Sequence, residues 1–250
     1  MDDLVVFLER VTAATTIEDV WHELTTVMDA SGFDRILYGF TRFRTAHSFG
    51  DPEDLLILTN HSRAYTDRFI GERLYADAPM VRWAAGNSGA RSWRWVKQNW
   101  DNLSPNEQRV AEFNRQMGVT AGIAVSFPAT SPRAKGGLAL TARADIDQDQ
   151  ADAIWERHGR ILLQMANVAH LKLTTLPYTG ARRPLTDRQR EALEWVGDGK
   201  TTQDIATIMG LTPATVEKHL RLAREALDVD TTAQAVLKAS FQNQIFVVAP

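Results

Sequence analysis

The chain has 250 residues, of which 44% are hydrophobic and 24% charged, a composition typical of a globular protein with a substantial core. It contains no cysteine, which excludes disulfides, thiolate chemistry and cysteine-ligated zinc sites. The formal net charge of −3 gives no support to an indiscriminate binder of polyanions.

The first expected elements are two amphipathic helices. The chain opens on Met1-Asp2-Asp3 and continues with apolar residues at helical spacing, a pattern unlike that of a signal peptide. A second helix begins after Thr16, a predicted N-cap, and ends at Ser31-Gly32.

Strands are then expected over residues 35–43 and 55–59, and short helices over residues 61–73 and 79–85. No apolar stretch approaches about 18 residues, so no transmembrane helix is expected.

The middle of the chain completes an α+β arrangement. Residues 104–107 (Ser-Pro-Asn-Glu) are a strong helix start, because serine serves as the N-cap, proline occupies the first helical position and glutamate the third. Strands over residues 119–127 and 137–143 and a long helix over residues 147–173 are expected to follow. We therefore predict an α-β-α sandwich with an antiparallel sheet over residues 1–173.

The C-terminal part carries only helical signals. Residues 174–184 contain two prolines, one glycine and three threonines, and are predicted to be a linker. Residues 185–250 are predicted to form an all-α helix-turn-helix domain. Its first helix is opened by a capping box of Thr186 and Gln189 and ends at residues 197–199.

The next two helices have the spacing of a helix-turn-helix. Thr201 or Thr202 caps a short helix, and Gly210 supplies the left-handed residue of a tight turn. Thr212 then caps a third helix with Pro213 at its first position. In this arrangement the second helix of the pair enters the major groove of DNA.

The third helix has an apolar and a polar face. Its inward face is expected to consist of Val216, Leu220, Ala223 and Leu227. On the other side, Arg221 has the guanidinium fork that suits guanine O6 and N7, while Glu217 either accepts from cytosine N4 or pairs with Arg221. From Tyr178 onward nine basic residues balance nine acidic ones, so DNA binding depends on charge placement. The predicted DNA contacts are Lys200, Thr201, Thr215, Glu217, Lys218, Arg221, Arg224 and Lys238.

A set of residues across this segment matches a known pattern. They are Leu185-Thr186, Arg188, Glu191, Leu193, Trp195, Gly199-Lys200-Thr201, Asp204-Ile205-Ala206, Thr215-Val216, His219, Leu227 and Val229. The segment resembles the C-terminal DNA-binding domain of the LuxR family, with Gln189 in place of a glutamate and Ala226 in place of a basic residue. The resemblance implies sequence-specific binding to double-stranded DNA as a homodimer, with the fourth helix contributing to the dimer contact.

A second pattern lies in the first domain. Its residues are His61, Tyr65, Phe69, Asp77-Ala78-Pro79, Trp93-Arg94-Trp95, Gly118, Gly122 and Phe127-Pro128. They resemble the acyl-homoserine-lactone-binding domain of quorum-sensing regulators, with His61 in place of an aromatic residue and Ala78 between an aspartate and a proline that are usually adjacent. The residue set of a phosphorylated receiver cannot be placed, and the phosphate loop of an ATPase is absent.

This second resemblance implies a pocket for a small neutral amphiphile. Asp77 is predicted to accept the ligand amide N–H, and Trp95 or Trp93 to donate to the lactone carbonyl. Tyr65 would bind the amide carbonyl or form a stacking wall, and Tyr38 would line the cavity. The predicted ligand-binding residues are Tyr38, His61, Tyr65, Asp77, Trp93 and Trp95, and neither a cofactor nor a metal is expected.

We therefore expect a ligand-responsive transcriptional regulator that acts in the bacterial cytoplasm. Its expected partners are double-stranded DNA, a small-molecule autoinducer and a second copy of the chain, with RNA polymerase as a further candidate and no membrane partner. Two alternatives stay open: a ligand-independent regulator of the same type, and an anti-activator that dimerises with a related regulator. The motifs G-x-S-x-G and H-E-x-x-H are absent, so no enzyme activity is expected.

Overall fold

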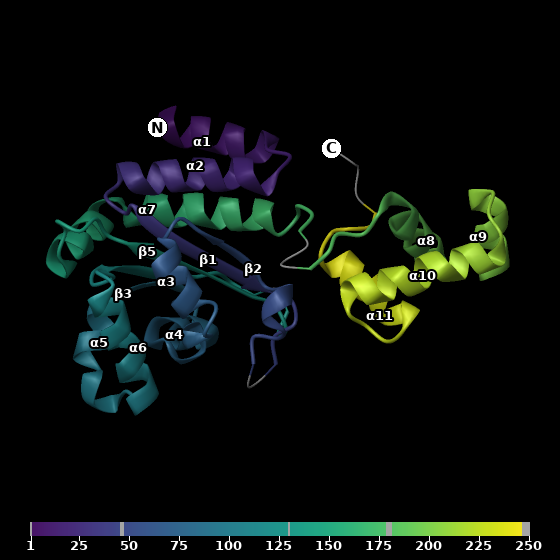
Figure 1. The fold of residues 1–250 in the computed structure, drawn as a ribbon. Helices are drawn as coiled ribbons and strands as arrows, with labels where there is room; N and C mark the ends of the chain where they lie inside the picture. Colours follow the sequence, from purple (N-terminus) through teal and green to yellow (C-terminus); the bar gives the residue numbers. More distant parts are fainter. Residues whose placement is uncertain (1, 46–47, 130, 179–181, 247–250) are drawn as a thin grey trace. The chain divides into compact units, whose positions relative to one another are not determined.

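The polypeptide folds into two compact units (Figure 1). The computed structural model describes residues 2–45, 48–129, 131–178 and 182–246. Unit 1 consists of residues 1–50 and 55–174, and unit 2 consists of residues 51–54 and 175–250. Within the described ranges, no helix is both long enough and apolar enough to cross a lipid bilayer.

In its described part, unit 1 is built on a five-stranded antiparallel sheet with the strand order β2-β1-β5-β4-β3. The strands are β1 (Arg35–Thr41), β2 (Leu56–Thr59), β3 (Gly89–Ser92), β4 (Gly122–Ser126) and β5 (Lys135–Thr141). The predicted α+β class with an antiparallel sheet is confirmed. The sequence pattern does not predict β3, because Gly-Ala-Arg-Ser contains none of the β-branched or aromatic residues that favour strands.

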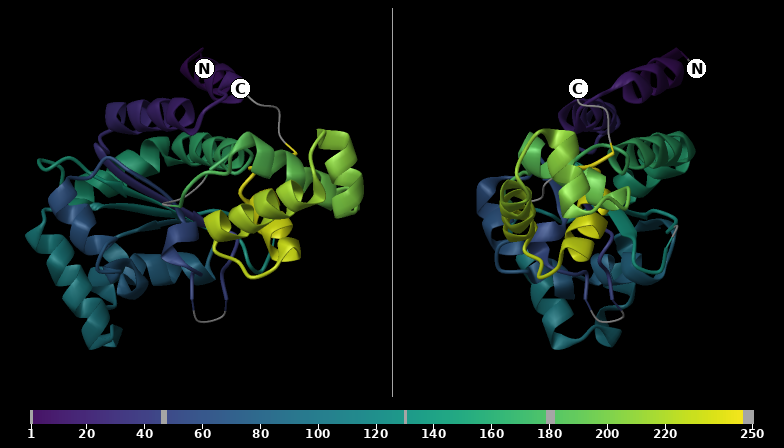
Figure 2. Two further views of the ribbon diagram at one scale, coloured as in Figure 1. Left: turned by 45° about the vertical axis from the view of Figure 1, so that its right-hand side comes forward. Right: turned by 90° about the vertical axis from the view of Figure 1, so that its right-hand side faces the viewer.

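Helices cover both faces of the sheet (Figure 1 and Figure 2). One face is covered by α7 (Gln148–Leu173), on which α1 (Asp2–Ala13) and α2 (Ile17–Ala30) pack in turn. The other face carries the helices α3 (Arg63–Phe69), α4 (Pro79–Gly86), α5 (Arg94–Gln98) and α6 (Pro105–Gln116), with 3-10 turns at Leu74–Asp77 and Trp100–Asn102. Because this second layer is made of short pieces, it leaves space between itself and the sheet.

Side-chain caps fix the starts of two predicted helices in unit 1. The Thr16 hydroxyl accepts a backbone N–H from the first turn of α2. Ser104 and Glu107 form the predicted capping box at the start of α6. Such caps satisfy backbone N–H groups that the first helical turn leaves unpaired. Both helix starts are therefore confirmed at the residues that the sequence indicates.

The described part of unit 2 contains four α-helices around one apolar core. They are α8 (Asp187–Gly197), α9 (Thr202–Met209), α10 (Pro213–Leu227) and α11 (Thr232–Phe241). Leu193, Ile205 and Leu220 lie at the centre of this core. α9 ends at Gly210, whose φ of +66° is a left-handed conformation that glycine adopts without strain. The predicted helix-turn-helix is confirmed.

A buried ion cluster holds the segment Asp51–Asp54 within unit 2. Asp54 is 5% exposed, and its carboxylate receives Lys238 Nζ at 2.7 Å and Arg182 Nε at 3.1 Å. Arg182 makes further ion pairs with Asp51, Glu53 and Asp228. Lys238 is itself 8% exposed. The structure therefore does not present Lys238 for a phosphate contact, contrary to its prediction as a surface lysine, because its charge is used inside the unit.

Candidate ligand cavity and DNA-reading helix

Two adjoining cavities lie between the sheet of unit 1 and its second helical layer. The larger has a volume of about 380 Å³, within the range of small-molecule sites, and the smaller of about 130 Å³. The two share a wall formed by Leu37, Phe69, Met80, Val81 and Ala139. We call the larger the polar end and the smaller the apolar end of one site.

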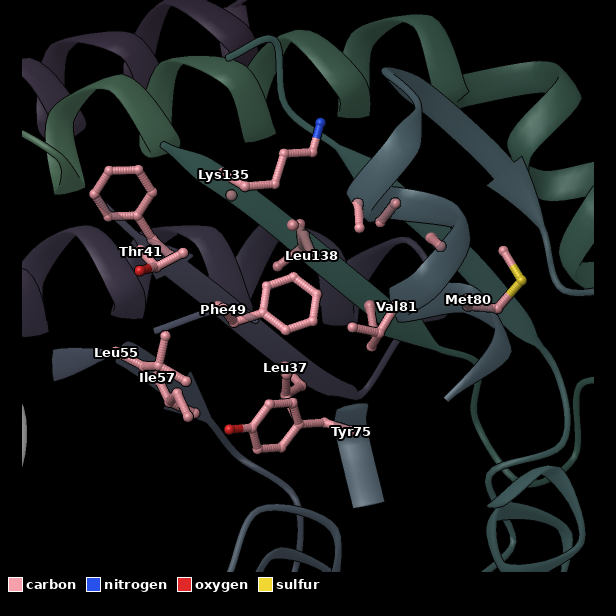
Figure 3. Close-up of a pocket in the computed structure, with 18 of the residues that line it drawn as sticks. Leu37, Thr41, Phe49, Leu55, Ile57, Tyr75, Met80, Val81, Lys135 and Leu138 are labelled. Carbon is pink, nitrogen blue, oxygen red and sulfur yellow. The ribbon is translucent and has the colours of Figure 1, made fainter. Parts of the chain in front are cut away.

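The apolar end is lined mainly by aliphatic and aromatic side chains (Figure 3). Phe49, Tyr75 and Val81 gather around it. The sheet contributes Leu37 from β1 and its register partner Ala139 from β5. Burying hydrocarbon against such a surface is favourable by about 25 cal/mol per Å². This end therefore suits an alkyl or acyl chain.

The lysine at the apolar end is already engaged. Lys135 Nζ donates to the backbone carbonyls of Asn87 at 2.7 Å and Phe127 at 3.2 Å. Burial lowers the pKa of Lys135. These bonds join the start of β5 to the segments that flank β3 and β4, so the role of Lys135 in this structure is to hold these segments together.

An aromatic stack forms one wall of the polar end. The ring of Tyr65 stacks with those of His61 and Phe69, with centroids 4.5 Å and 5.0 Å apart. The Tyr65 hydroxyl donates to Asn114 Oδ1 at 3.1 Å, and His61 Nε2 lies 3.4 Å from Thr141 Oγ1. Burial lowers the pKa of His61 to about 4 and raises the pKa of Tyr65. Both rings are therefore uncharged at neutral pH.

The indole of Trp93 carries a buried donor beside the polar end. Trp93 lines the cavity, and among the described residues its Nε1 has no hydrogen-bond partner. Gly122 fixes the position of this ring. The backbone N–H of Trp93 donates to the Gly122 carbonyl at 3.0 Å, and a Cβ on Gly122 would lie 3.1 Å from the indole. An unsatisfied buried donor costs about 1–3 kcal/mol. An acceptor on a bound ligand would remove that cost.

A hydrogen-bond network fixes the backbone on both sides of Trp93. Asp152 on α7 accepts from Ser92 Oγ at 2.6 Å and from Arg94 Nε at 2.7 Å. Gln148 donates to the same carboxylate at 2.7 Å and also binds the backbone at the start of β4. Although burial acts to raise it, the pKa of Asp152 is lowered by these hydrogen bonds. The network anchors the Trp93 turn to α7.

In unit 2, α10 presents its polar face to solvent. Its buried residues are the four predicted ones, Val216, Leu220, Ala223 and Leu227. Lys218 and Arg221 are exposed, as predicted. Arg221 pairs with Glu225 one turn later, and Glu217 instead accepts from Thr202 Oγ1 at 2.9 Å. Of the two pairings weighed for Glu217, the one with Arg221 is therefore not formed in this structure.

The remaining predicted DNA contacts differ in how free their side chains are. Lys200 is exposed. Thr201 caps α9, and Thr215 bonds the hydroxyl that caps α10. Arg224 is half-buried and donates to Thr232 Oγ1 at 2.8 Å.

Within the described ranges, no group of three histidine or carboxylate side chains could hold a metal ion.

Comparison with known proteins identifies the family. Residues 16–173 match the autoinducer binding domain, and residues 183–239 match the bacterial regulatory proteins of the luxR family. The chain belongs to the LuxR family. It is an autoinducer-binding transcriptional regulator of that type, which confirms the resemblance of both segments.

Individual LuxR-type relatives are similar over most of the chain. The transcriptional activator protein AnoR of Acinetobacter nosocomialis is 27% identical over 212 residues, 83% of this chain and 84% of AnoR. The HTH-type quorum sensing-dependent transcriptional regulator RpaR of Rhodopseudomonas palustris is 28% identical over 209 residues, 80% of this chain and 81% of RpaR. A crystal structure of Escherichia coli SdiA covers 98% of both chains with a TM-score of 0.54 and 19% identity, which shows a shared fold.

Three of the six predicted ligand-binding residues of this LuxR-family regulator line the polar end, namely His61, Tyr65 and Trp93. Asp77 and Trp95 are not among the described residues that line either cavity. Ala78, the residue after Asp77, lines the polar end together with Pro79 at the first position of α4. The structure therefore brings the aromatic part of the predicted site together, but not its carboxylate.

Tyr38 lies on the other face of the sheet. Its hydroxyl lies 2.8 Å from His170 Nδ1 on α7, and the side chain is fully buried. Because side chains alternate along β1, Leu37 faces the cavity while Tyr38 faces α7. Contrary to the prediction, Tyr38 is therefore not a lining residue of either described cavity.

Several residues that line the two cavities could not be predicted from the sequence. Asn114 lies on α6 and Thr141 at the end of β5, and both bring polar atoms to the polar end. Neither carries a signal that separates it from an ordinary surface residue. Phe49 and Tyr75, at the apolar end, come from segments whose local pattern indicates only loops or turns.

Proposed function

We propose that this regulator senses a small neutral amphiphile, an acyl-homoserine lactone or a compound of similar shape, in the cavity of unit 1. The observation that carries the proposal is the Trp93 Nε1 donor, which is buried without a partner among the described residues and belongs to a side chain that lines the polar end. A ligand carbonyl would accept from it, and an acyl chain would occupy the apolar end.

The charge state of the cavity supports a neutral ligand. Burial keeps His61 unprotonated at neutral pH, since its pKa is lowered to about 4. Tyr65 keeps its proton because burial raises its pKa. A cationic head group buried beside these rings would lose its hydration without gaining an opposite charge, because the described lining residues include no carboxylate. Among the described residues at this end, an anionic head group would meet only the exposed Lys97 and Arg115, which Glu112 already pairs. We therefore assign Trp93 to the ligand carbonyl and Tyr65 to the cavity wall, and give Asp77 no ligand contact.

The element that binds DNA in the proposed regulator is α10. Lys218 and Arg221 lie exposed on its polar face, while the opposite face is anchored in the core of unit 2. A helix held in this way can enter the major groove with its basic side chains toward base edges and phosphates. We propose that two copies bind an inverted repeat, with half-sites about one helical turn apart.

The proposal is tested by ligand-dependent thermal stability. The full-length regulator is heated with a series of acyl-homoserine lactones of increasing chain length. At one hundred times its Kd, a ligand that binds the folded state should stabilise it by about 2.7 kcal/mol. Trp93→Phe keeps a ring but removes the donor, so it should raise the Kd about fivefold.

The control variant is Trp21→Phe. Trp21 lies on α2 and is not among the described residues that line either cavity, so this change should leave the Kd unaltered. Two results would contradict the proposal. One is a melting temperature that no compound of the series changes; the other is a Trp93→Phe variant that binds the ligand as tightly as the wild type.

A further inference from the structure

Several side chains at the polar end of the cavity are hydrogen-bond donors. Trp93 Nε1 is buried without a partner among the described residues. Lys97, which is exposed, also lines this end, and its ammonium group offers only donors. Arg115, whose guanidinium also offers only donors, lines the same end and is paired with Glu112. A ligand head group placed here would therefore meet donors first.

The side-chain acceptors at the polar end are neutral, and two of them already take part in hydrogen bonds. Asn114 Oδ1 accepts from the Tyr65 hydroxyl, and Thr141 Oγ1 shares a hydrogen bond with His61 Nε2. The described residues that line the two cavities include neither an aspartate nor a glutamate. A ligand N–H would therefore find only uncharged side-chain acceptors there.

Ala78 occupies the point from which a carboxylate would enter the polar end. It is 3% exposed, lines the cavity and directly precedes Pro79, the first residue of α4. Its neighbour Asp77 closes the 3-10 turn before it and is not among the described lining residues. The methyl group of Ala78 gives a ligand N–H no partner.

From these contacts we infer that the cavity recognises its ligand through acceptors alone. The inference rests on the proposed function and narrows its ligand class: acyl esters and ketones serve as well as amides. A site built to bond a ligand N–H rejects the analogue that lacks it by a factor of about 10⁴–10⁵, because a buried group is left unpaired. Here no such penalty arises, since Trp93 reads a carbonyl that amide and ester share.

The test compares two compounds that differ in one atom. They are an N-acyl-homoserine lactone and the α-acyloxy-γ-butyrolactone with the same acyl chain, in which an ester oxygen replaces the amide N–H. Each pair is titrated into the full-length wild-type regulator by calorimetry. The inference predicts Kd values within about tenfold of each other, because only a neutral hydrogen bond separates the compounds. An amide that binds more than tenfold tighter would overturn it.

A substitution can build the missing acceptor. Ala78→Asp should shift the preference toward the amide by at least about tenfold relative to wild type, because its carboxylate can bond the N–H. Ala78→Asn has nearly the same shape without the charge and should shift the preference less. If the aspartate variant does not fold, the wild-type ratio of the two Kd values decides the question alone.

The outcomes separate this inference from the proposed function. If the amide binds and the ester is rejected, the regulator still senses an acyl lactone and only the inference fails. If neither compound of any chain length binds, the proposed function fails and the inference fails with it. Trp93→Phe should weaken both compounds by the same factor, and weakening of the amide alone would also overturn the inference.

Discussion

Lys238 Nζ lies 2.7 Å from Asp54 Oδ2, although the two residues come from distant parts of the sequence. The two side chains are only 10% and 6% exposed. The sequence favours a phosphate contact for Lys238, because it lies in the last turn of the helix that follows the DNA-binding helix. Here it neutralises a buried carboxylate, so the basic surface of unit 2 rests on other residues.

Asp54→Asn should therefore destabilise the regulator strongly. Breaking a buried ion pair by removing one partner costs about 3–5 kcal/mol, because the remaining charge stays buried. Glu53→Gln is the matched control: this neighbour pairs with the same Arg182, but its side chain is 58% exposed, and its loss should cost about 0–1 kcal/mol. Urea unfolding of the full-length protein measures both. Equal effects of the two substitutions would contradict a buried cluster.

Stability should fall as the pH falls from about 6.5 toward 4. Burial lowers the pKa of His61 and of His170 to about 4, from an ordinary value of 6.5. Between these values the unfolded chain binds protons that the folded chain does not, so protonation favours unfolding. Each histidine accounts for up to about 3 kcal/mol, fully present above pH 6.5 and lost as the pH approaches 4.

Urea unfolding at a series of pH values measures this dependence. His61→Phe keeps a ring against Tyr65 but cannot bind a proton, so its stability should decline less steeply over the same range. A decline as steep as that of the wild type would show that His61 takes no part in it.

Arg221→Ala should weaken DNA binding and relax base preference. Arg221 is exposed on α10 and is paired on the surface of its own helix, with Glu225. Loss of a bidentate contact to guanine costs about 1–3 kcal/mol at the base that it reads. Lys218→Ala is the comparison, with uniform weakening expected for a phosphate contact. If Arg221→Ala weakens every sequence equally, Arg221 is also a phosphate contact and reads no base.

Asp152→Ala should loosen the Trp93 turn. Asp152 accepts from Ser92, Arg94 and Gln148, and its removal takes one acceptor from each of them at a cost of about 1–3 kcal/mol in unfolding free energy. Ligand affinity should fall with it, because the indole donor is less well placed. Asp149→Ala removes a 79% exposed partner of the same arginine and should change stability by less than about 0.5 kcal/mol. Unaltered ligand affinity in Asp152→Ala would contradict the positioning role.

Most of the helices could be predicted because their signals are local. The Ser104 capping box and the Gly210 turn depend on a few consecutive residues, and the structure confirms both. The buried face of α10 follows from spacing alone. The strand β3 and the short helix α5 could not be found, since neither is long enough to show a period.

The candidate site was only partly predictable, because it depends on which way a strand or turn faces. Alternation along β1 separates Leu37 from Tyr38, but helices cover both faces of this sheet, so the pattern does not tell which face holds the cavity. In the same way, proximity in sequence cannot decide whether Asp77 or Ala78 turns inward. The burial of Lys238 could not be predicted because its partner, Asp54, lies far away in the sequence.

The most direct test of the central claim measures DNA affinity with and without ligand. A duplex selected from a randomised pool is titrated with the wild-type regulator, alone and saturated with a bound acyl lactone or its ester. The account predicts that the ligand changes DNA affinity, in either direction, by about 5–150-fold, and that Trp93→Phe needs more ligand for the same change. A ligand that saturates the cavity yet leaves DNA affinity unchanged would contradict the account.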